Sequence, residues 1–343
     1  MKSTLLRVLN NFSQCIDTSL LINVSKQKFL APVYHLVSDV RVPHIEHLYP
    51  IRSIQTFKND LDYLLSCYEP INLKELIRTV HGGKEMIKNT FFLSFDDGLS
   101  ECYHIIAPIL KEKGVPATFF LNSAFIDNND LFFKYKLSII LDTILRSKNA
   151  EALILRVKEL FTKNKVLFKD IQTSLLSLRY NHTSMINSIA LELNIDFTQY
   201  LKEHSPYLST EQIQALIKEG HTIGAHSIDH PLYADLKMED QLLQTKESVN
   251  FISNQFSLDY KTFAFPFTDF GVKNEFFDKM YTHNQVMVDL SFGSAGIKKD
   301  VSKFHIHRFP MERTGESAKT LINTELLYYI CKMFVNKNRI SRS

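Results

Sequence analysis

The feature that most constrains the fold is a regular alternation of short apolar runs and amphipathic segments along the chain. The apolar runs are rich in Phe, Val, Ile and Thr, as buried strands are. They are Pro32–Val37, Phe91–Phe95, Ala117–Leu121, Thr222–Ala225, Thr262–Phe265, Val286–Asp289 and Phe304–Arg308. The clearest segments with helical spacing are Phe57–Cys67, Cys102–Lys113, Ser209–Lys218 and Met238–Phe251. Such alternation implies parallel strands that are joined by right-handed crossovers.

The number of these strand–helix units predicts an α/β fold, a distorted (β/α)7-type barrel with a helical insertion. The insertion is expected at about 131–201, where the chain is rich in Leu, Ile and Lys and contains neither Gly nor Pro. Around it we expect an N-terminal helical extension (1–30), the barrel (31–325) and a C-terminal helix with a basic tail (326–343). Barrels of this type carry their chemistry at the C-terminal ends of the strands, so functional residues are expected there.

The overall composition argues against several classes of protein. A net charge of +3 does not predict nucleic-acid binding, which needs a concentrated basic face. No apolar run has the length of a signal-peptide core or of a membrane span, so we predict a cytoplasmic protein. The four cysteines are scattered and predict neither a disulfide framework nor a cysteine zinc site. The basic tail after Lys332 is expected to be solvated, with a weak membrane-surface contact as the alternative.

Two adjacent carboxylates follow the strand predicted at Phe91–Phe95. Asp96 and Asp97 precede Gly98, and on its own this Asp-Asp-Gly sequence is more typical of a turn than of a functional site. At the C-terminal end of a barrel strand, however, one carboxylate can bind a cation while the other accepts a proton. The pair is therefore a candidate for hydrolase chemistry.

Two histidines follow the strand predicted at Thr222–Ala225. His226 and His230 are four residues apart, a spacing that places both imidazoles on one side of a helical turn or helix-like loop. Two histidines and one carboxylate leave coordination positions open for water and substrate, as catalytic zinc sites do. The spacing therefore favours metal ligation over a purely structural role for this pair.

Taken together, these segments resemble the polysaccharide deacetylases, the carbohydrate esterases that share the NodB-homology domain. The segments that carry the resemblance are Tyr34-His35, Phe95–Gly98, Gly114–Phe120, His226–His230 and Phe263–Phe267. Their order and spacing agree with the family. The match covers Pro32 to Arg313 and is interrupted by the helical insertion.

This resemblance implies a metal-dependent mechanism. Asp97, His226 and His230 would hold a divalent metal ion, with Zn²⁺ as the first choice and Co²⁺ or Mn²⁺ as alternatives. Asp96 would act as the general base beside them. The physical logic agrees, because a bound divalent ion polarises a carbonyl and lowers the pKa of its water from about 15.7 toward about 7.

The resemblance also implies where the substrate binds. Phe265, Pro266 and Phe267 would line the groove, and the backbone N–H of Phe267 would help to hold the oxyanion. His35 lies at the C-terminal side of the first predicted strand and would reach the rim of the site. The chain contains no Trp, so Phe and Tyr must provide any stacking on sugar rings.

The leaving amine must gain a proton, and the family usually supplies it from a histidine on a late strand. His305 and His307 both qualify, because alternate residues of a strand point to the same side. We prefer His307, which lies nearer the C-terminal end of the strand. Arg308 would orient Asp96 or the substrate. The arginine that many members carry before the third motif is missing here, so either Lys261 or Arg308 would replace it or the pKa of Asp96 is set in another way.

The leading hypothesis is the hydrolysis of N-acetyl groups on an aminosugar-containing polysaccharide or its precursor. A second hypothesis keeps the metal site and changes the substrate to a lipid- or nucleotide-linked sugar or to an O-acetyl ester. A third is a carbohydrate-binding protein on an inactive deacetylase fold. The retention of Asp96 and of all three expected ligands favours an enzyme.

Overall fold

The computed structural model describes residues 9–10, 12–282, 287–313 and 315–342, and its centre is a parallel sheet that curls into a barrel. The strands pair in the order β10-β9-β8-β7-β6-β5-β2-β11. Their bounds are β2 Pro32–Tyr34, β5 Leu93–Phe95, β6 Ala117–Leu121, β7 Thr222–Ala225, β8 Thr262–Ala264, β9 Leu290–Gly293, β10 His305–His307 and β11 Phe309–Pro310. Every pairing between them is parallel, as the alternating sequence pattern predicts.

The last strand brings the two edges of the sheet together. Only Arg308 separates β10 from β11, yet β10 pairs with β9 while β11 pairs with β2. Counted as one broken strand, β10 and β11 reduce the eight strands to seven positions around a nearly closed barrel. The predicted seven-unit α/β barrel is therefore confirmed.

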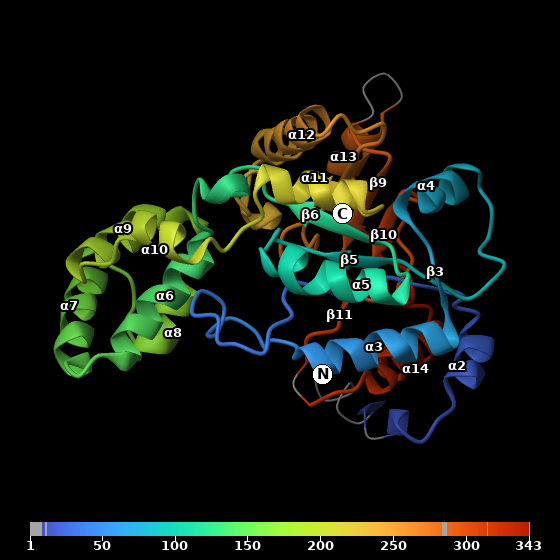
Figure 1. Cartoon of the computed structure of the whole chain (residues 1–343), viewed down its shortest axis with the longest axis horizontal. Helices are drawn as coiled ribbons and strands as arrows, with labels where there is room; N and C mark the ends of the chain where they lie inside the picture. The colour runs from blue at the N-terminus through green and yellow to red at the C-terminus, as the bar shows by residue number, and fades with distance from the viewer. Residues whose placement is uncertain (1–8, 11, 283–286, 314, 343) are drawn as a thin grey trace.

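Helices cover the outside of the barrel (Figure 1). They are α2 Thr18–Ser25, α3 Ile54–Cys67, α4 Leu73–His81, η1 Cys102–Ile106, α5 Ala107–Lys113, α11 Thr210–Lys218, η4 Tyr233–Asp235, α12 Met238–Gln255, α13 Asn274–Tyr281 and α14 Ala318–Phe334. The ends of several helices are fixed by side chains; Ser209 and Gln212, for example, form a reciprocal capping box at the start of α11. A second sheet, in the order β1-β4-β3, contains β1 Phe29–Leu30, β3 Glu69–Pro70 and β4 Thr90–Phe91.

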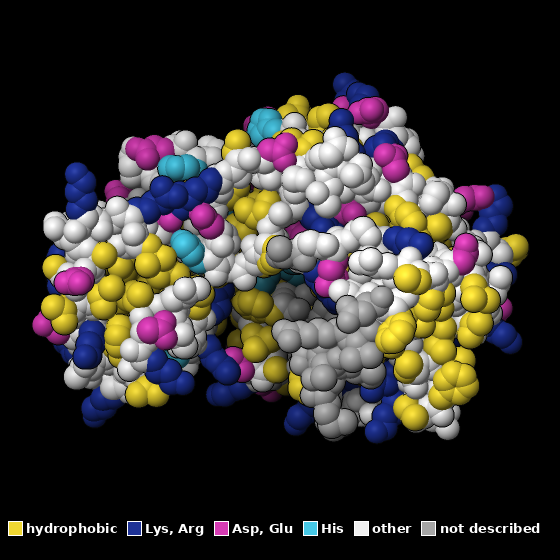
Figure 2. All heavy atoms as spheres, turned by 90° about the horizontal axis from the view of Figure 1, so that it is seen from below, with side chains coloured by type: hydrophobic (Ala, Val, Ile, Leu, Met, Phe, Trp, Pro, Cys, Tyr) yellow, Lys and Arg dark blue, Asp and Glu magenta, His cyan; other side chains and the backbone are white. Residues whose placement is uncertain are grey.

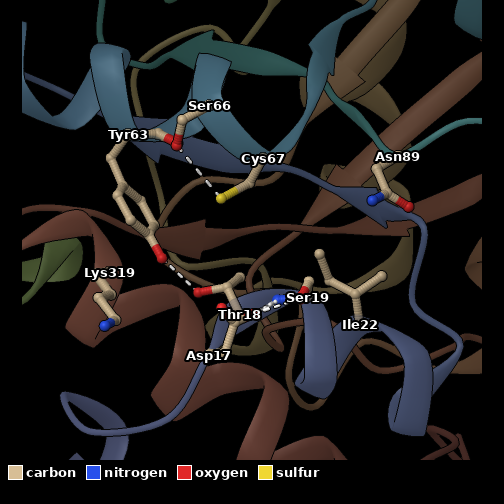
Figure 3. Close-up of a pocket in the computed structure, with 9 residues that line it drawn as sticks. All are labelled: Asp17, Thr18, Ser19, Ile22, Tyr63, Ser66, Cys67, Asn89 and Lys319. Carbon is tan, nitrogen blue, oxygen red and sulfur yellow. Dashed lines mark hydrogen bonds between the residues drawn. The ribbon is translucent and has the colours of Figure 1, made fainter.

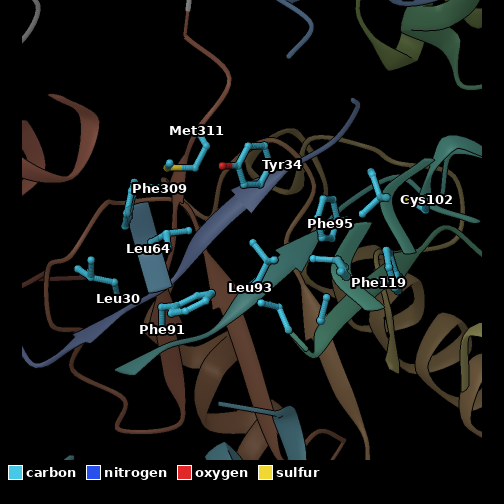
Figure 4. Packing of buried hydrophobic residues seen from close by; sticks show 14 of the residues in the cluster. Leu30, Tyr34, Leu64, Phe91, Leu93, Phe95, Cys102, Phe119, Phe309 and Met311 are labelled. Carbon is cyan, nitrogen blue, oxygen red and sulfur yellow. The ribbon is translucent and has the colours of Figure 1, made fainter. Parts of the chain in front are cut away.

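The alternation of side chains along the strands creates two apolar layers. Phe292 contacts both Phe92 and Phe120 from a strand that neighbours neither of them, so their layer fills the interior of the barrel. The alternate residues of the same strands, such as Phe95 and Phe119, point the other way and belong to the layer between the strands and the helices (Figure 4). A residue's place in this alternation therefore tells which face of the wall its side chain occupies.

The helical insertion follows β6 and forms a lobe beside the barrel (Figure 1). Its elements are η2 Ile126–Asn128, α6 Phe133–Arg146, α7 Ala150–Lys163, α8 Ile171–Ser177, η3 Tyr180–His182, α9 Thr183–Glu192 and α10 Phe197–His204. The lobe has an apolar core of its own, to which Ile140, Val157 and Phe161 contribute. From below, the surface is hollowed between the lobe and the barrel, and positive and negative side chains are interspersed (Figure 2).

One predicted strand is wrong. The apolar run Val286–Asp289 precedes β9, which begins only at Leu290, and Val286 lies outside the described residues. The sequence of β9 is not typical of a strand, because Ser291 and Gly293 are poor strand formers. A Cβ on Gly293 would lie 2.4 Å from Asp269 Oδ1, so the close packing of Asp269 against the strand requires a glycine here.

Helices near the two ends of the chain pack together on one side of the barrel. Helix α14 packs against α2 and α3, and Asn323 donates hydrogen bonds to the carbonyls of Ser13 and Ile16 (2.8 and 3.0 Å). None of the described helices is long and apolar enough to cross a membrane. The expected division of the chain at residues 30 and 325 stays a prediction, and so does the cytoplasmic location. Helix α14 itself already begins at Ala318.

Candidate active site

Asp97, His226 and His230 converge at the C-terminal ends of β5 and β7. The Nε2 atoms of His226 and His230 lie 3.5 and 3.2 Å from Asp97 Oδ1. All three side chains are buried, with 1 to 5% exposure. Asp97 has a φ of 71°, an unusual left-handed conformation for a residue other than Gly, and it turns the backbone sharply at the end of β5.

These three residues fit a divalent metal ion. Asp97 Oδ1 is buried and accepts no hydrogen bond, and the three potential donor atoms lie within 4.8 Å of one another. His226 donates its Nδ1 proton to the carbonyl of Ala264 (2.8 Å), which leaves the Nε2 lone pair directed at Asp97. Burial lowers the pKa of His226 to about 4, so the imidazole is neutral and able to coordinate.

Asp96 lies inside the barrel and is held by Arg308. The guanidinium donates to both carboxylate oxygens at 2.7 Å and also to Ser94 Oγ at 3.0 Å. Burial alone would raise the pKa of Asp96, but the charge of Arg308 outweighs it and holds that pKa below its usual value. Of the two roles expected for Arg308, contact with Asp96 is the one that the geometry shows. Lys261, by contrast, donates to Asn250, so Arg308 is the one of the two basic residues that contacts Asp96.

His305 and His307 lie on the other face of the barrel wall. They alternate with Arg308, which points into the interior, and they pack toward α13, where the His305 ring meets Phe277 at 4.9 Å. Both nitrogens of His307 are engaged, Nε2 with Asp300 at 2.9 Å and Nδ1 with the backbone N–H of Ala295 at 3.3 Å. His307 therefore does not share the interior face with Asp96, although the sequence pattern favoured it as the acid.

His35 is placed differently. It follows β2 directly beside Asp96, since Tyr34 pairs with Phe95 and the Asp96 N–H donates to the carbonyl of Tyr34 (3.0 Å). Its Nδ1 lies 2.6 Å from Glu312, whose other oxygen accepts the backbone N–H of His35. Burial lowers the pKa of His35, but Glu312 outweighs that effect and raises it to about 10.

Of the three residues expected to line the groove, only Phe267 lies at the edge of the site. Phe265 is turned into the outer apolar layer, where it packs against Tyr233 and Phe277, so it does not line a groove. Pro266 is buried. Phe267 is 44% exposed, and its ring lies 4.6 Å from that of His230, at the edge of the site. The strand alternation explains the difference, because Phe263 and Phe265 both face outward.

Two contacts of the site were not predicted from the sequence. Glu312 reaches His35 from the segment after β11, and Tyr135 of the insertion donates its O–H to Asp97 Oδ2 at 2.7 Å. Neither residue belongs to a recognisable motif, and their partners are distant in sequence. The one available signal was the position of Glu312, an acidic residue shortly after the last predicted strand.

A separate polar cavity of about 410 Å³ lies where α2, α3 and α14 meet (Figure 3). Asp17, Thr18, Tyr63, Cys67 and Lys319 are among the residues that line it. None of the predicted site residues lines it. It therefore plays no part in the arrangement around Asp97.

The chain matches one family model and is similar to several solved structures. Residues 83–278 match the family model described as polysaccharide deacetylase. Among solved structures, the chain is similar to a deacetylase from Streptococcus pyogenes in complex with acetate, with 13% identity, a TM-score of 0.55 and coverage of 87% of this chain and 97% of that one. No curated protein matches it.

Two further structures have the same fold. A de-N-acetylase from Aggregatibacter actinomycetemcomitans is 16% identical, with a TM-score of 0.54 and coverage of 86% of this chain and 99% of that one. IcaB from Ammonifex degensii is 14% identical, with a TM-score of 0.51 and coverage of 87% and 97%. At these identities the likeness shows the fold, while the family model spans more than half of the chain. The chain belongs to the polysaccharide deacetylase family, hydrolases that act on carbon–nitrogen bonds other than peptide bonds.

Proposed function

We propose that this protein removes N-acetyl groups from an aminosugar-containing polysaccharide or its precursor, with a metal ion held by Asp97, His226 and His230. The observation that carries the proposal is the buried Asp97 Oδ1, which has no hydrogen-bond donor and faces both imidazole Nε2 atoms. When bound, a divalent ion would polarise the acetyl carbonyl and make water more acidic. Zn²⁺ suits this set of nitrogen and oxygen ligands best.

Asp96 would act as the general base. Its Oδ2 lies 3.9 Å from His226 Nε2, so it is adjacent to the proposed ligands without contacting them. The bidentate contact with Arg308 fixes the carboxylate and keeps it ionised. An ionised, oriented carboxylate at this position can take a proton from the attacking water.

We further propose that His35, and not His307, donates the proton to the leaving amine. Its ring is oriented by Glu312 in the manner of a histidine–carboxylate pair, and it lies next to Asp96 on the neighbouring strand. Its side chain is 27% exposed, so it stands at the rim, where a substrate can reach it. With a pKa raised to about 10, it carries its proton at neutral pH.

The metal assignment is tested with purified protein, acetylated aminosugar oligomers and Zn²⁺, Co²⁺ or Mn²⁺. Asp97→Ala should lose both bound metal and acetate release, whereas Asp62→Ala, which removes an exposed carboxylate paired with Lys113, should lose neither. If Asp97→Ala retains metal and activity, the assignment is wrong. Parallel assays with lipid- and nucleotide-linked sugars and with O-acetyl esters would identify the preferred substrate class.

The proton donor is tested by comparing His35→Gln with His307→Gln. The first should lower kcat by about 10²- to 10⁴-fold, the usual contribution of a general acid. The second should leave kcat within a few-fold of the unchanged protein, because its contacts are on the outer face. A large loss of kcat in His307→Gln with little change in His35→Gln would instead identify His307 as the proton donor.

A further inference from the structure

The two oxygens of Asp97 have different surroundings. Oδ1 faces the imidazoles and receives no hydrogen bond, while Oδ2 accepts one from the hydroxyl of Tyr135 at 2.7 Å. Tyr135 lies on α6, the first long helix of the insertion, and is completely buried. A segment outside the barrel therefore contacts one of the proposed metal ligands directly.

Tyr135 is held in one orientation by its neighbours. Its ring stacks on Tyr207 at 6.1 Å and meets Phe132 and His44 at 5.0 and 5.2 Å. Because its single proton goes to Asp97, the 3.3 Å contact with the hydroxyl of Tyr49 must be a hydrogen bond donated by Tyr49.

The insertion also contacts a second proposed ligand. The ring of Phe132 lies 4.2 Å from that of His230, and Phe267 packs on the same imidazole at 4.6 Å. His230 Nδ1 is buried and has no hydrogen-bond partner, in contrast to His226 Nδ1, which is bound to the carbonyl of Ala264. The orientation of His230 thus depends on packing against aromatic rings, one of which comes from the insertion.

We propose that the start of the insertion, through Tyr135 and Phe132, is a structural part of the metal site and sets its affinity for the ion. Tyr135 is a positioning residue: it occupies Asp97 Oδ2 and leaves Oδ1 as the coordinating oxygen. Phe132 keeps the His230 ring directed at the same point. This inference rests on the proposed function, because it requires that Asp97 and His230 hold a metal ion. Hydrogen bonds to metal-bound carboxylates typically change metal affinity by about 10- to 100-fold.

The test is the dissociation constant of Zn²⁺ for Tyr135→Phe, measured by competition with a chromophoric chelator. The variant keeps the ring and removes only the hydroxyl, so we expect binding that is about 10- to 100-fold weaker than in the unchanged protein. The absorption spectrum of the Co²⁺ form should change as well, because Oδ2 of Asp97 becomes free to coordinate. Tyr233→Phe is the matched control: it removes a buried hydroxyl that contacts Thr245 at 2.9 Å, away from Asp97, and should bind Zn²⁺ unchanged.

The outcomes separate this inference from the proposed function. Equal Zn²⁺ affinity and an unchanged Co²⁺ spectrum in Tyr135→Phe would overturn the role of the insertion and leave the deacetylase assignment intact. If the unchanged protein binds no metal, both proposals fail. Should Tyr135→Phe not fold, Tyr49→Phe is the second test of the inference. It removes the hydrogen bond that Tyr49 donates to the Tyr135 hydroxyl and does not remove any contact of Asp97. We expect it to bind Zn²⁺ several-fold more weakly, and an unchanged affinity would contradict the inference.

Discussion

At the scale of single residues, the buried pair of Asp96 and Arg308 matters most for the barrel interior. Arg308 is 2% exposed, and its guanidinium also lies over the ring of Phe120 at 5.2 Å. Such a pair adds little net stability when intact, because both charges lose their hydration. Removing one partner is costly, since the other charge then remains buried without compensation.

Arg308→Met should therefore destabilise the protein by about 3–5 kcal/mol and strongly reduce turnover. Arg308→Lys keeps the charge but loses the paired contacts with Asp96, so its stability should fall between that of Arg308→Met and that of the unchanged protein. Urea unfolding of the metal-free proteins measures the effect. If Arg308→Met is as stable and as active as the unchanged protein, Arg308 is not needed to orient the Asp96 carboxylate.

The contact between His35 and Glu312 predicts a pH dependence of stability. The folded-state pKa of His35 is raised to about 10, above its unfolded value of about 6.5, so its proton stabilises the fold. That contribution is fully present below about pH 6.5 and is lost as the pH rises toward 10. The groups that face His35 are Glu312, Asp96, Asp97 and Tyr49. In chelator-treated protein, the free energy of unfolding should decline over this range, and His35→Gln should reduce the decline. An identical pH profile in the variant would exclude the effect.

At the scale of elements, the C-terminal segment is fixed to the loop that carries Phe267. Arg342 was predicted to be solvated, but its side chain is only 3% exposed and donates to Asp269 and, at 2.6 Å, to Asp300. Asp269 in turn accepts a hydrogen bond from the backbone N–H of Ser294 at 3.1 Å. The guanidinium therefore joins an acidic cluster that also includes His305 and His307.

Arg342→Met should leave Asp269 and Asp300 without their arginine partner and loosen the loop after β8. We expect a lower melting temperature and a higher KM, with a smaller change in kcat, because the reacting groups lie on the other face of the wall. Arg339→Met, at an exposed position in the same tail, is the control. A change in kcat alone would argue that the cluster takes part in the reaction itself.

The elements also show what the sequence could predict. The bounds of β6 and β7 agree with the apolar runs, because these strands are buried on both faces and carry continuous hydrophobic sequence. Asp97, His226 and His230 were recognisable because each lies within a short local pattern. Tyr135 and Glu312 were not, since their contacts with Asp97 and His35 join parts of the chain 38 and 277 residues apart. The face occupied by His307 also could not be predicted, because it depends on the register of a strand that is broken at Arg308.

At the scale of the whole molecule, the barrel and the insertion have separate apolar cores, and two residues of the insertion's core contact the proposed metal ligands. The proposed ligands follow β5 and β7 of the barrel, while Tyr135 and Phe132 come from the lobe. A metal ion bound here would thus be held by residues of the barrel that are themselves oriented by residues of the insertion.

The most direct test of this account is acetate release measured as Zn²⁺ is added stepwise to chelator-treated protein, with bound metal quantified in the same samples. We predict that activity rises in proportion to bound metal and saturates at one ion per chain, and that His226→Ala and His230→Ala bind little metal and release little acetate. Full acetate release from metal-free protein, or full metal binding by both histidine variants, would contradict the assignment of Asp97, His226 and His230 as the metal site.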